Sequence, residues 1–244
     1  MRHGIWLLVG LLVACPTWAS EEEAKRRVAE LGGKVFLEKG VVTEVSLSGR
    51  QLEDEDLAGL LAFPALTDLS LENTRTGDAG MIHIAKLHKL EWLNLYRTWV
   101  GDEGARSLAK SKSLKLLPIG ETNLTDAGLA HLAGMSQLTY LGLRGNRVTD
   151  AGADYLAKLR KLEGLYLGET QVTDAGTSKL AGLKRLEKLW LHDLPVTDAS
   201  VEVLLGLKNL RELHVYATKI TPAGAKRLRA GLLNCRVIHE AFPN

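Results

Sequence analysis

Aspartates that recur every 24 residues are the most regular reactive groups in this sequence. The seven members are Asp54, Asp78, Asp102, Asp126, Asp150, Asp174 and Asp198. A row of carboxylates could bind metal ions. The same spacing also places each aspartate in the first turn of a predicted helix, where free N–H groups and the helix dipole stabilise negative charge. Because Pro222 replaces the eighth member, we favour the structural explanation and predict no metal site.

The other reactive side chains do not form a catalytic or cofactor motif. The sequence contains no H-E-x-x-H, no G-x-x-x-x-G-K-[ST] and no G-x-S-x-G. Cys235 is expected to be a small, buried and unreactive residue near the end of the fold. With 31 basic and 29 acidic residues, the net charge of +2 gives no electrostatic reason to expect a nucleic-acid partner. We therefore predict no catalytic residue and no cofactor.

Aromatic and basic side chains form a more informative group. They lie in or beside short strand-like segments: Trp92, Tyr96, Arg97, Trp99, Tyr140, Arg144, Arg147, Tyr166, Trp190, His192, His214 and Tyr216. Aromatic residues favour strands for packing reasons alone. An open surface rich in Trp, Tyr and Arg also has the composition of a protein-binding hot spot. The predicted helical side carries one tyrosine, Tyr155, so we favour the second explanation and predict a partner-binding surface.

A 24-residue repeat must position these residues. Its eight copies begin at Val42, Leu66, Leu90, Leu114, Leu138, Leu162, Leu186 and Leu210, without insertion or deletion. The pattern L-x-x-L-x-L at the start of a copy predicts a short strand with one buried face. A Thr or Gly further along is a suitable helix N-cap, and Pro222 after Thr221 suits the first helical position. Each copy should therefore contain one strand and one helix.

The copies GDEGARSLA, residues 101–109, and VTDAGADYLA, residues 148–157, show what this repeat is similar to. They resemble bacterial leucine-rich repeats of the VTDAGL or GALA type, related to the ribonuclease-inhibitor class. The resemblance implies an α/β fold, a right-handed leucine-rich-repeat solenoid forming an open arc. Strands lie on the concave side because they pack more closely than helices. Familiar repeats carry an Asn that bonds the adjacent turn, and the recurrent Thr, such as Thr74 and Thr98, should form a smaller version of that ladder.

The chain is predicted to divide into a signal peptide at 1–19, an N-terminal cap at 20–41, the repeats at 42–234 and a C-terminal cap at 235–244. The apolar run of residues 5–14 is too short to span a bilayer comfortably and fits a secretory signal. Thr17 and Ala19 suit cleavage before Ser20, which we favour. Residues 12–15, LVAC, instead resemble a lipobox that would make Cys15 a lipidated first residue. Either route predicts an exported protein that meets the membrane through its signal sequence or a lipid anchor.

Two copies depart from the pattern. Pro118 lies inside the fourth predicted strand, where it removes a hydrogen-bond donor. The seventh copy has Leu194 in place of the recurrent Thr, then Pro195, and Ser200 in place of a Gly. Tolerance by the surrounding structure is the favoured explanation, and a local distortion that shapes a binding surface is the alternative.

These observations together predict a non-catalytic protein-interaction scaffold of the cell envelope that binds a protein or peptide on its aromatic concave face. Flat aromatic rings with polar neighbours could also bind a cell-wall glycan. A structural envelope component, in which the repeat face packs against itself, is the third possibility. The scaffold is reused for many partners, so the repeat alone does not select among them.

Overall fold

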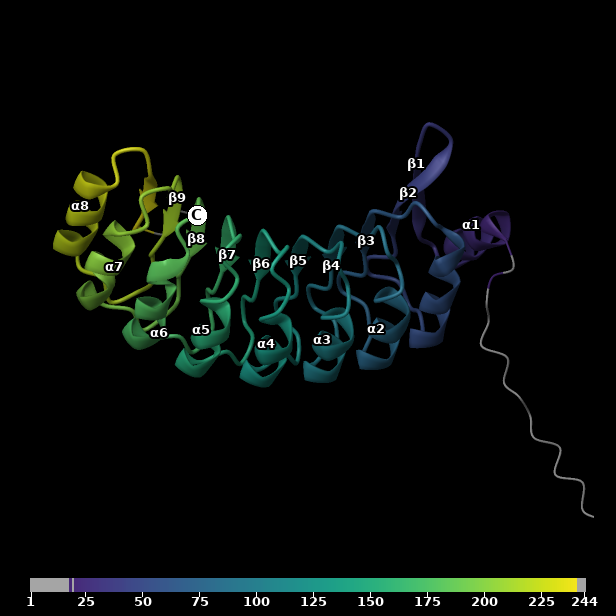
Figure 1. The fold of residues 1–244 in the computed structure, drawn as a ribbon, viewed down its shortest axis with the longest axis horizontal. Helices are drawn as coiled ribbons and strands as arrows, with labels where there is room; N and C mark the ends of the chain where they lie inside the picture. The colour runs from purple at the N-terminus through teal and green to yellow at the C-terminus, as the bar shows by residue number, and fades with distance from the viewer. Residues whose placement is uncertain (1–17, 19, 241–244) are drawn as a thin grey trace, which may run out of the picture.

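The computed structural model describes residues 18 and 20–240, and these form an open arc (Figure 1). A sheet runs along the concave side in the order β1-β2-β3-β4-β5-β6-β7-β8-β9-β10. Short helices cover the convex side (Figure 1). Strand order follows chain order because every copy returns the chain to a position one layer further along. This arrangement confirms the predicted α/β solenoid.

An N-terminal cap closes the first end of the sheet. Helix α1 (Glu21–Glu30) begins at Ser20, whose hydroxyl accepts a hydrogen bond from the backbone N–H of Glu23 at 3.2 Å. Strand β1 (Lys34–Glu38) pairs antiparallel with β2 (Val41–Ser46), and all later neighbours pair in parallel. The hairpin projects beyond the other strands (Figure 1), and β1 forms the N-terminal edge of the sheet.

The repeat strands are three residues long and lie in strict register. They are β3 (Asp68–Ser70), β4 (Trp92–Asn94), β5 (Leu116–Pro118), β6 (Tyr140–Gly142), β7 (Gly164–Tyr166), β8 (Lys188–Trp190), β9 (Glu212–His214) and β10 (Arg236–Ile238). Leu141, for example, lies opposite Leu165, and Leu165 opposite Leu189. Paired residues on neighbouring strands are 24 positions apart, which is the repeat length, so equivalent positions form columns across the sheet.

The convex side carries η1 (Asp54–Ala62), α2 (Asp78–Ile84), α3 (Asp102–Leu108), α4 (Asp126–Leu132), α5 (Asp150–Leu156), α6 (Asp174–Lys179), η2 (Leu180–Gly182), η3 (Asp198–Ser200), α7 (Val201–Leu205) and α8 (Pro222–Gly231). The expectation of a helix in every copy holds. The first copy, however, forms a 3-10 helix, and the seventh begins with a 3-10 turn.

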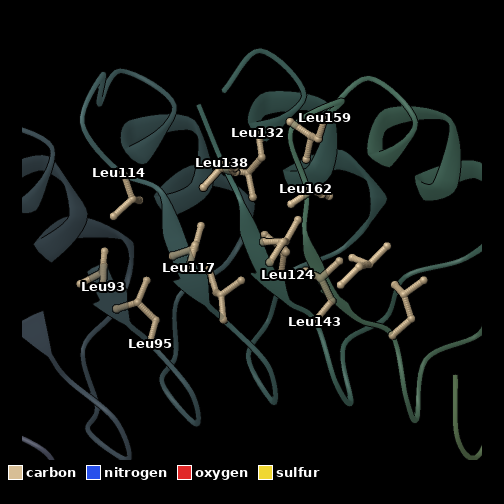
Figure 2. Packing of buried hydrophobic residues seen from close by; sticks show 14 of the residues in the cluster. Leu93, Leu95, Leu114, Leu117, Leu124, Leu132, Leu138, Leu143, Leu159 and Leu162 are labelled. Atoms are coloured by element: carbon tan, nitrogen blue, oxygen red, sulfur yellow. The ribbon is translucent and has the colours of Figure 1, made fainter. Parts of the chain in front are cut away.

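Leucine columns fill the space between sheet and helices. Leu93, Leu117 and Leu143 point from the strands into this core, where helix residues such as Leu132 meet them (Figure 2). Each of these side chains is fully buried. Stacking is essential, since one copy alone could not bury its apolar face.

The aspartate column joins each copy to the next. Asp126 Oδ1 accepts the backbone N–H of Thr149 at 2.9 Å, and Asp126 Oδ2 accepts the Thr149 hydroxyl at 2.6 Å. The Thr149 hydroxyl in turn accepts the N–H of Ala151 as the N-cap of α5. Each aspartate lies in the first turn of its own helix, as predicted. The carboxylate of Asp126, however, accepts its hydrogen bonds from the following copy, which the sequence did not predict. Pro222 begins α8, the last helix among residues 20–240, so no later helix in this range would be bonded by an aspartate there.

The same carboxylates explain a glycine column and its exception. A Cβ at Gly152 would lie 2.3 Å from Oδ1 of Asp126, so a side chain here would have to shift the carboxylate. In the seventh copy Ser200 occupies this position and donates a hydrogen bond to Asp174 Oδ1 at 2.5 Å. Leu194, the other irregular residue, is buried. The seventh copy is thus accommodated by local contacts.

The threonine ladder differs from the expectation. The hydroxyls of Thr74 and Thr98 donate to Leu71 and Leu95, carbonyls of their own copies, at 2.7 Å each. Thr122, at the same repeat position, also donates to Asn146 Oδ1 of the next copy at 3.2 Å. Asn146 does bridge copies, since its Nδ2 donates to the Ile119 carbonyl at 2.7 Å.

Candidate binding surface

The concave face presents every second residue of the strands. Leucines of the alternating positions face the core, so the residues between them face the hollow of the arc. Seven of the predicted site residues lie at such positions in β4 to β9 or directly after those strands: Trp92, Tyr96, Tyr140, Arg144, Tyr166, Trp190 and Tyr216. His192 and His214 share this face but are buried by their neighbours. Arg97, Trp99 and Arg147 lie in the loops that follow the strands.

A hollow of about 230 Å³, here called the central hollow, opens in the middle of this face. It is lined by Tyr96, Pro118, Gly120, Tyr140, Gly142, Arg144 and Tyr166. The hollow forms at this point of the face because Pro118, Gly120 and Gly142 have small side chains or none. A Cβ at Gly120 would lie 2.8 Å from the Arg144 carbonyl, so this position excludes larger residues. Three tyrosines from copies 24 or more residues apart form its walls.

Pro118 shapes this floor and also loosens the sheet. Strands β4 and β5 share a single paired position, Trp92 opposite Leu116, whereas β5 and β6 share three. The carbonyl of Pro118 still accepts the N–H of Leu95 at 2.8 Å. Proline lacks only the N–H donor, so the hydrogen bond that its carbonyl accepts from the neighbouring copy persists.

Acidic residues hold two of the predicted arginines. Arg97 Nε donates to Glu121 Oε2 at 2.7 Å, and Arg144 Nε donates to Glu169 Oε1 at 2.8 Å. The hydroxyl of Tyr96 also donates to Glu121. Each pair bridges neighbouring copies, which orients the guanidinium groups at the rim of the central hollow. Exposed pairs of this kind contribute little to stability, about 0–1 kcal/mol.

Aromatic rings pack together toward the C-terminal end of the face. Tyr166 stacks on Trp190 with ring centroids 4.9 Å apart, and His192 stacks on Tyr216 at 4.7 Å. His214 lies against Trp190 at 5.5 Å. Such contacts stabilise rings by about 0.5–1.5 kcal/mol beyond their burial. The rings therefore form a rigid, pre-organised patch beside the central hollow.

His192 connects this patch to the turns. Its side chain is 2% exposed, Nδ1 lies 2.8 Å from Asp193 Oδ2, and Nε2 lies 3.0 Å from the Tyr166 hydroxyl. Glu169, His192 and Asp193 place ligand-type atoms within 4.8 Å of one another. Both ring nitrogens of His192 are already within hydrogen-bond distance of protein groups, which favours a structural role for this cluster over metal binding. The sequence did not indicate this cluster because Glu169 belongs to another copy.

Burial sets the ionisation of several groups. It raises the pKa of Tyr140 and of Tyr166 above the ordinary tyrosine value, so both hydroxyls remain protonated donors at neutral pH. Burial, with a smaller effect of Glu212, raises the pKa of Cys235 to about 11. That pKa agrees with the expectation of an unreactive thiol.

A second hollow of about 450 Å³, here called the rim hollow, lies along the loops of the first three copies. It is lined by Gly49, Arg50, Gln51, Leu52, Glu53, Asn73, Thr74, Arg75, Arg97 and Trp99. Trp99 is 60% exposed, and the Arg75 guanidinium carbon lies 5.6 Å from the centre of its ring. The sequence pattern predicted Arg97 and Trp99 as site residues but not Arg50 and Arg75. Arg75 shares its repeat position with Trp99 and Arg147, and this was the available signal, whereas Arg50 lies one position earlier in its copy.

The turn that carries Arg97 requires a left-handed backbone at the same position of every copy. Arg97 has φ 57°, Glu121 50° and Glu169 59°, and glycine occupies the position at Gly49 and Gly145. Charged residues here accept a conformation that favours glycine. This column places Arg97, Glu121 and Glu169 on the rim, where they form the ion pairs described above.

Comparisons with known proteins agree with this geometry. The family model described as Leucine Rich repeat matches residues 86–109 and 135–157. The chain is a leucine-rich-repeat solenoid. Curated protein sequences include no match.

Solved structures of leucine-rich-repeat proteins are similar over most of this chain. Internalin C2 of Listeria monocytogenes is 26% identical with a TM-score of 0.66, covering 81% of this chain and 80% of its own. Internalin InlF of the same organism is 26% identical with a TM-score of 0.59, covering 77% and 58%. The HAESA receptor kinase ectodomain of Arabidopsis, solved with the IDA peptide hormone, is 20% identical with a TM-score of 0.63, covering 88% and 40%. This chain thus spans less than two thirds of the last two, and the HAESA likeness shows the fold alone.

The predicted export signal and membrane contact concern the N-terminal part of the chain. The helices within the described residues are all too short or too polar to cross a membrane. Cys15 and nearly all of the predicted signal peptide lie outside the described residues. The exception is Trp18, which is 8% exposed and packs in the apolar core.

Proposed function

We propose that this protein is a non-catalytic interaction scaffold that binds a protein or peptide on its concave face. The central hollow carries the proposal, because three tyrosine walls and a floor without large side chains form a preformed anchor site. The volume of about 230 Å³ suits one apolar or aromatic side chain of a ligand. The rigid ring patch beside it offers further apolar surface, so little ordering is needed on binding.

The proposed location is outside the cytoplasm, in the periplasm, at the cell surface or secreted, as the signal-type N-terminus indicates. Support for a peptide or protein ligand comes from the central hollow and the stacked rings beside it, which suit the apolar side chains of a peptide or protein segment. The glycan and self-packing alternatives predict different ligands, so each has a measurement of its own below.

A phage-displayed library of 12-residue peptides, selected on the purified protein, tests this function. Selected peptides should share an apolar or aromatic anchor residue. Tyr140→Ala should weaken their binding about 30-fold, which corresponds to the roughly 2 kcal/mol expected of a hot spot. Tyr155→Ala is the matched control, since Tyr155 lies in α5 on the convex side.

Three results would contradict the proposal. They are a library that yields no common peptide, a Tyr140→Ala variant that binds selected peptides as the wild type does, and an equal loss of binding in both tyrosine variants. Circular dichroism of each variant shows that the fold is kept. A glycan array that gives specific binders where peptides fail would favour the carbohydrate alternative, and a concentration-dependent mass in light scattering would favour self-packing.

A further inference from the structure

The rim hollow adjoins the central hollow. Tyr96 lines the central hollow, and the next residue, Arg97, lines the rim hollow. A ligand anchored between the tyrosines can therefore continue onto the loops of the first three copies. The inference below rests on the proposed function and concerns the part of the ligand that lies there.

Positive charge in the rim hollow is not neutralised. Arg50 and Arg75 are exposed, and among residues 18 and 20–240 neither takes part in an ion pair. Arg97 differs, because Glu121 holds it at 2.7 Å. The one acidic residue of the lining, Glu53, takes part in the capping box that starts η1. Two guanidinium groups thus remain available to an anion.

Trp99 adds an exposed aromatic ring to the charged groups of the rim hollow. Its ring is 60% exposed, although large aromatic side chains tend to be covered in folded proteins. Arg75 lies over the ring at 5.6 Å, a cation–π contact that restricts the guanidinium. A restricted guanidinium loses less freedom when it binds a carboxylate with two hydrogen bonds.

We propose that the rim hollow binds an acidic segment of the peptide ligand. Carboxylates of Asp or Glu side chains bind Arg50 and Arg75, while an adjoining part of the segment lies on the exposed ring of Trp99. The apolar anchor in the central hollow and the acidic segment in the rim hollow then define the direction of the ligand along the arc.

The test uses the 12-residue library selected in parallel on the wild type, on the double variant Arg50→Gln/Arg75→Gln and on Arg185→Gln. Arg185 is the matched control, because it is exposed, lies outside the predicted partner-binding residues and does not line the rim hollow. Wild type and control should enrich Asp or Glu at a constant distance from the apolar anchor, and the double variant should not. For one selected peptide, Glu→Gln should weaken binding to the wild type about three- to tenfold and leave binding to the double variant unchanged.

The outcomes separate this inference from the function on which it rests. Peptides with a common apolar anchor but no acidic enrichment overturn the acidic segment and leave the proposed function standing. Acidic enrichment that persists in the double variant also overturns it. A selection that yields no common peptide removes both. Displacement of the selected peptide by hexagalacturonate at equal concentration would assign the site to an acidic glycan and overturn the peptide assignment.

Discussion

Trp18 should couple energetically to Gly59, and the coupling bears on where the mature chain begins. Trp18 is 8% exposed, and a Cβ at Gly59 would lie 1.8 Å from Cδ2 of its ring. The indole therefore rests directly on the backbone of η1. Cleavage before Ser20 would remove Trp18, whereas cleavage before Cys15 would retain it.

The structure supports an estimate of what this removal costs. A buried tryptophan withdraws about 200 Å² from water, which is worth about 5 kcal/mol at roughly 25 cal/mol per Å². Ordering the backbone and the side chain of Trp18 itself opposes this by about 1–2 kcal/mol each. A chain that begins at Ser20 should therefore be about 2 kcal/mol less stable at this end than a chain that begins at Cys15.

Gly59→Ala provides the decisive measurement when it is made in both chains. With Trp18 present, the added methyl group must displace the indole and should cost about 2 kcal/mol or more. Without Trp18 the space is free, and alanine should be neutral or slightly stabilising in a helix. Urea unfolding and hydrogen exchange of α1 and η1 measure the effect, since a solenoid can open from one end.

Equal effects of Gly59→Ala in the two chains would refute the packing argument, because the coupling free energy would then be zero. The intact mass of the exported protein gives an independent result. A mature N-terminus at Ser20 would agree with the favoured cleavage, and Trp18 would then have no role in the folded protein.

Three further predictions concern groups within the solenoid. Asp126→Ala should reduce the free energy of unfolding by about 2–3 kcal/mol, because it leaves the Thr149 N–H without its acceptor; urea unfolding measures this, and the exposed Asp154→Ala should change it by less than about 0.5 kcal/mol. Burial alone would raise the pKa of Asp150, but the bonds from Thr173 and Gly176 outweigh it and lower that pKa. A lowered folded-state pKa contributes stability above the unfolded value near 4, which is lost as pH falls through the folded value. The unfolding temperature should accordingly stay level near neutral pH and fall below about pH 4, and a level profile down to pH 2 would contradict this. Cys235, with a pKa of about 11, should react with iodoacetamide at pH 8 far more slowly in the folded protein than in urea.

Much of the architecture followed from local pattern. The 24-residue period predicted the strands, the helix starts and the core leucines, because alternation and N-cap chemistry act over a few residues. The partner of each aspartate did not follow. Asp126 and Thr149 are 23 residues apart, so their contact depends on how tightly successive copies stack. The 3-10 helix of the first copy, against the α-helices of most others, is likewise absent from the pattern.

The candidate site divides in the same way. Residue types and their alternation determined which side chains face the concave surface, since a strand turns every second residue to one side. Only the tertiary structure decided that Tyr96, Tyr140 and Tyr166 enclose one hollow, that Arg144 is held by Glu169, and that His192 is buried. Those facts depend on distances between copies, and the curvature and rotamers that set these distances arise from the packing of the whole stack.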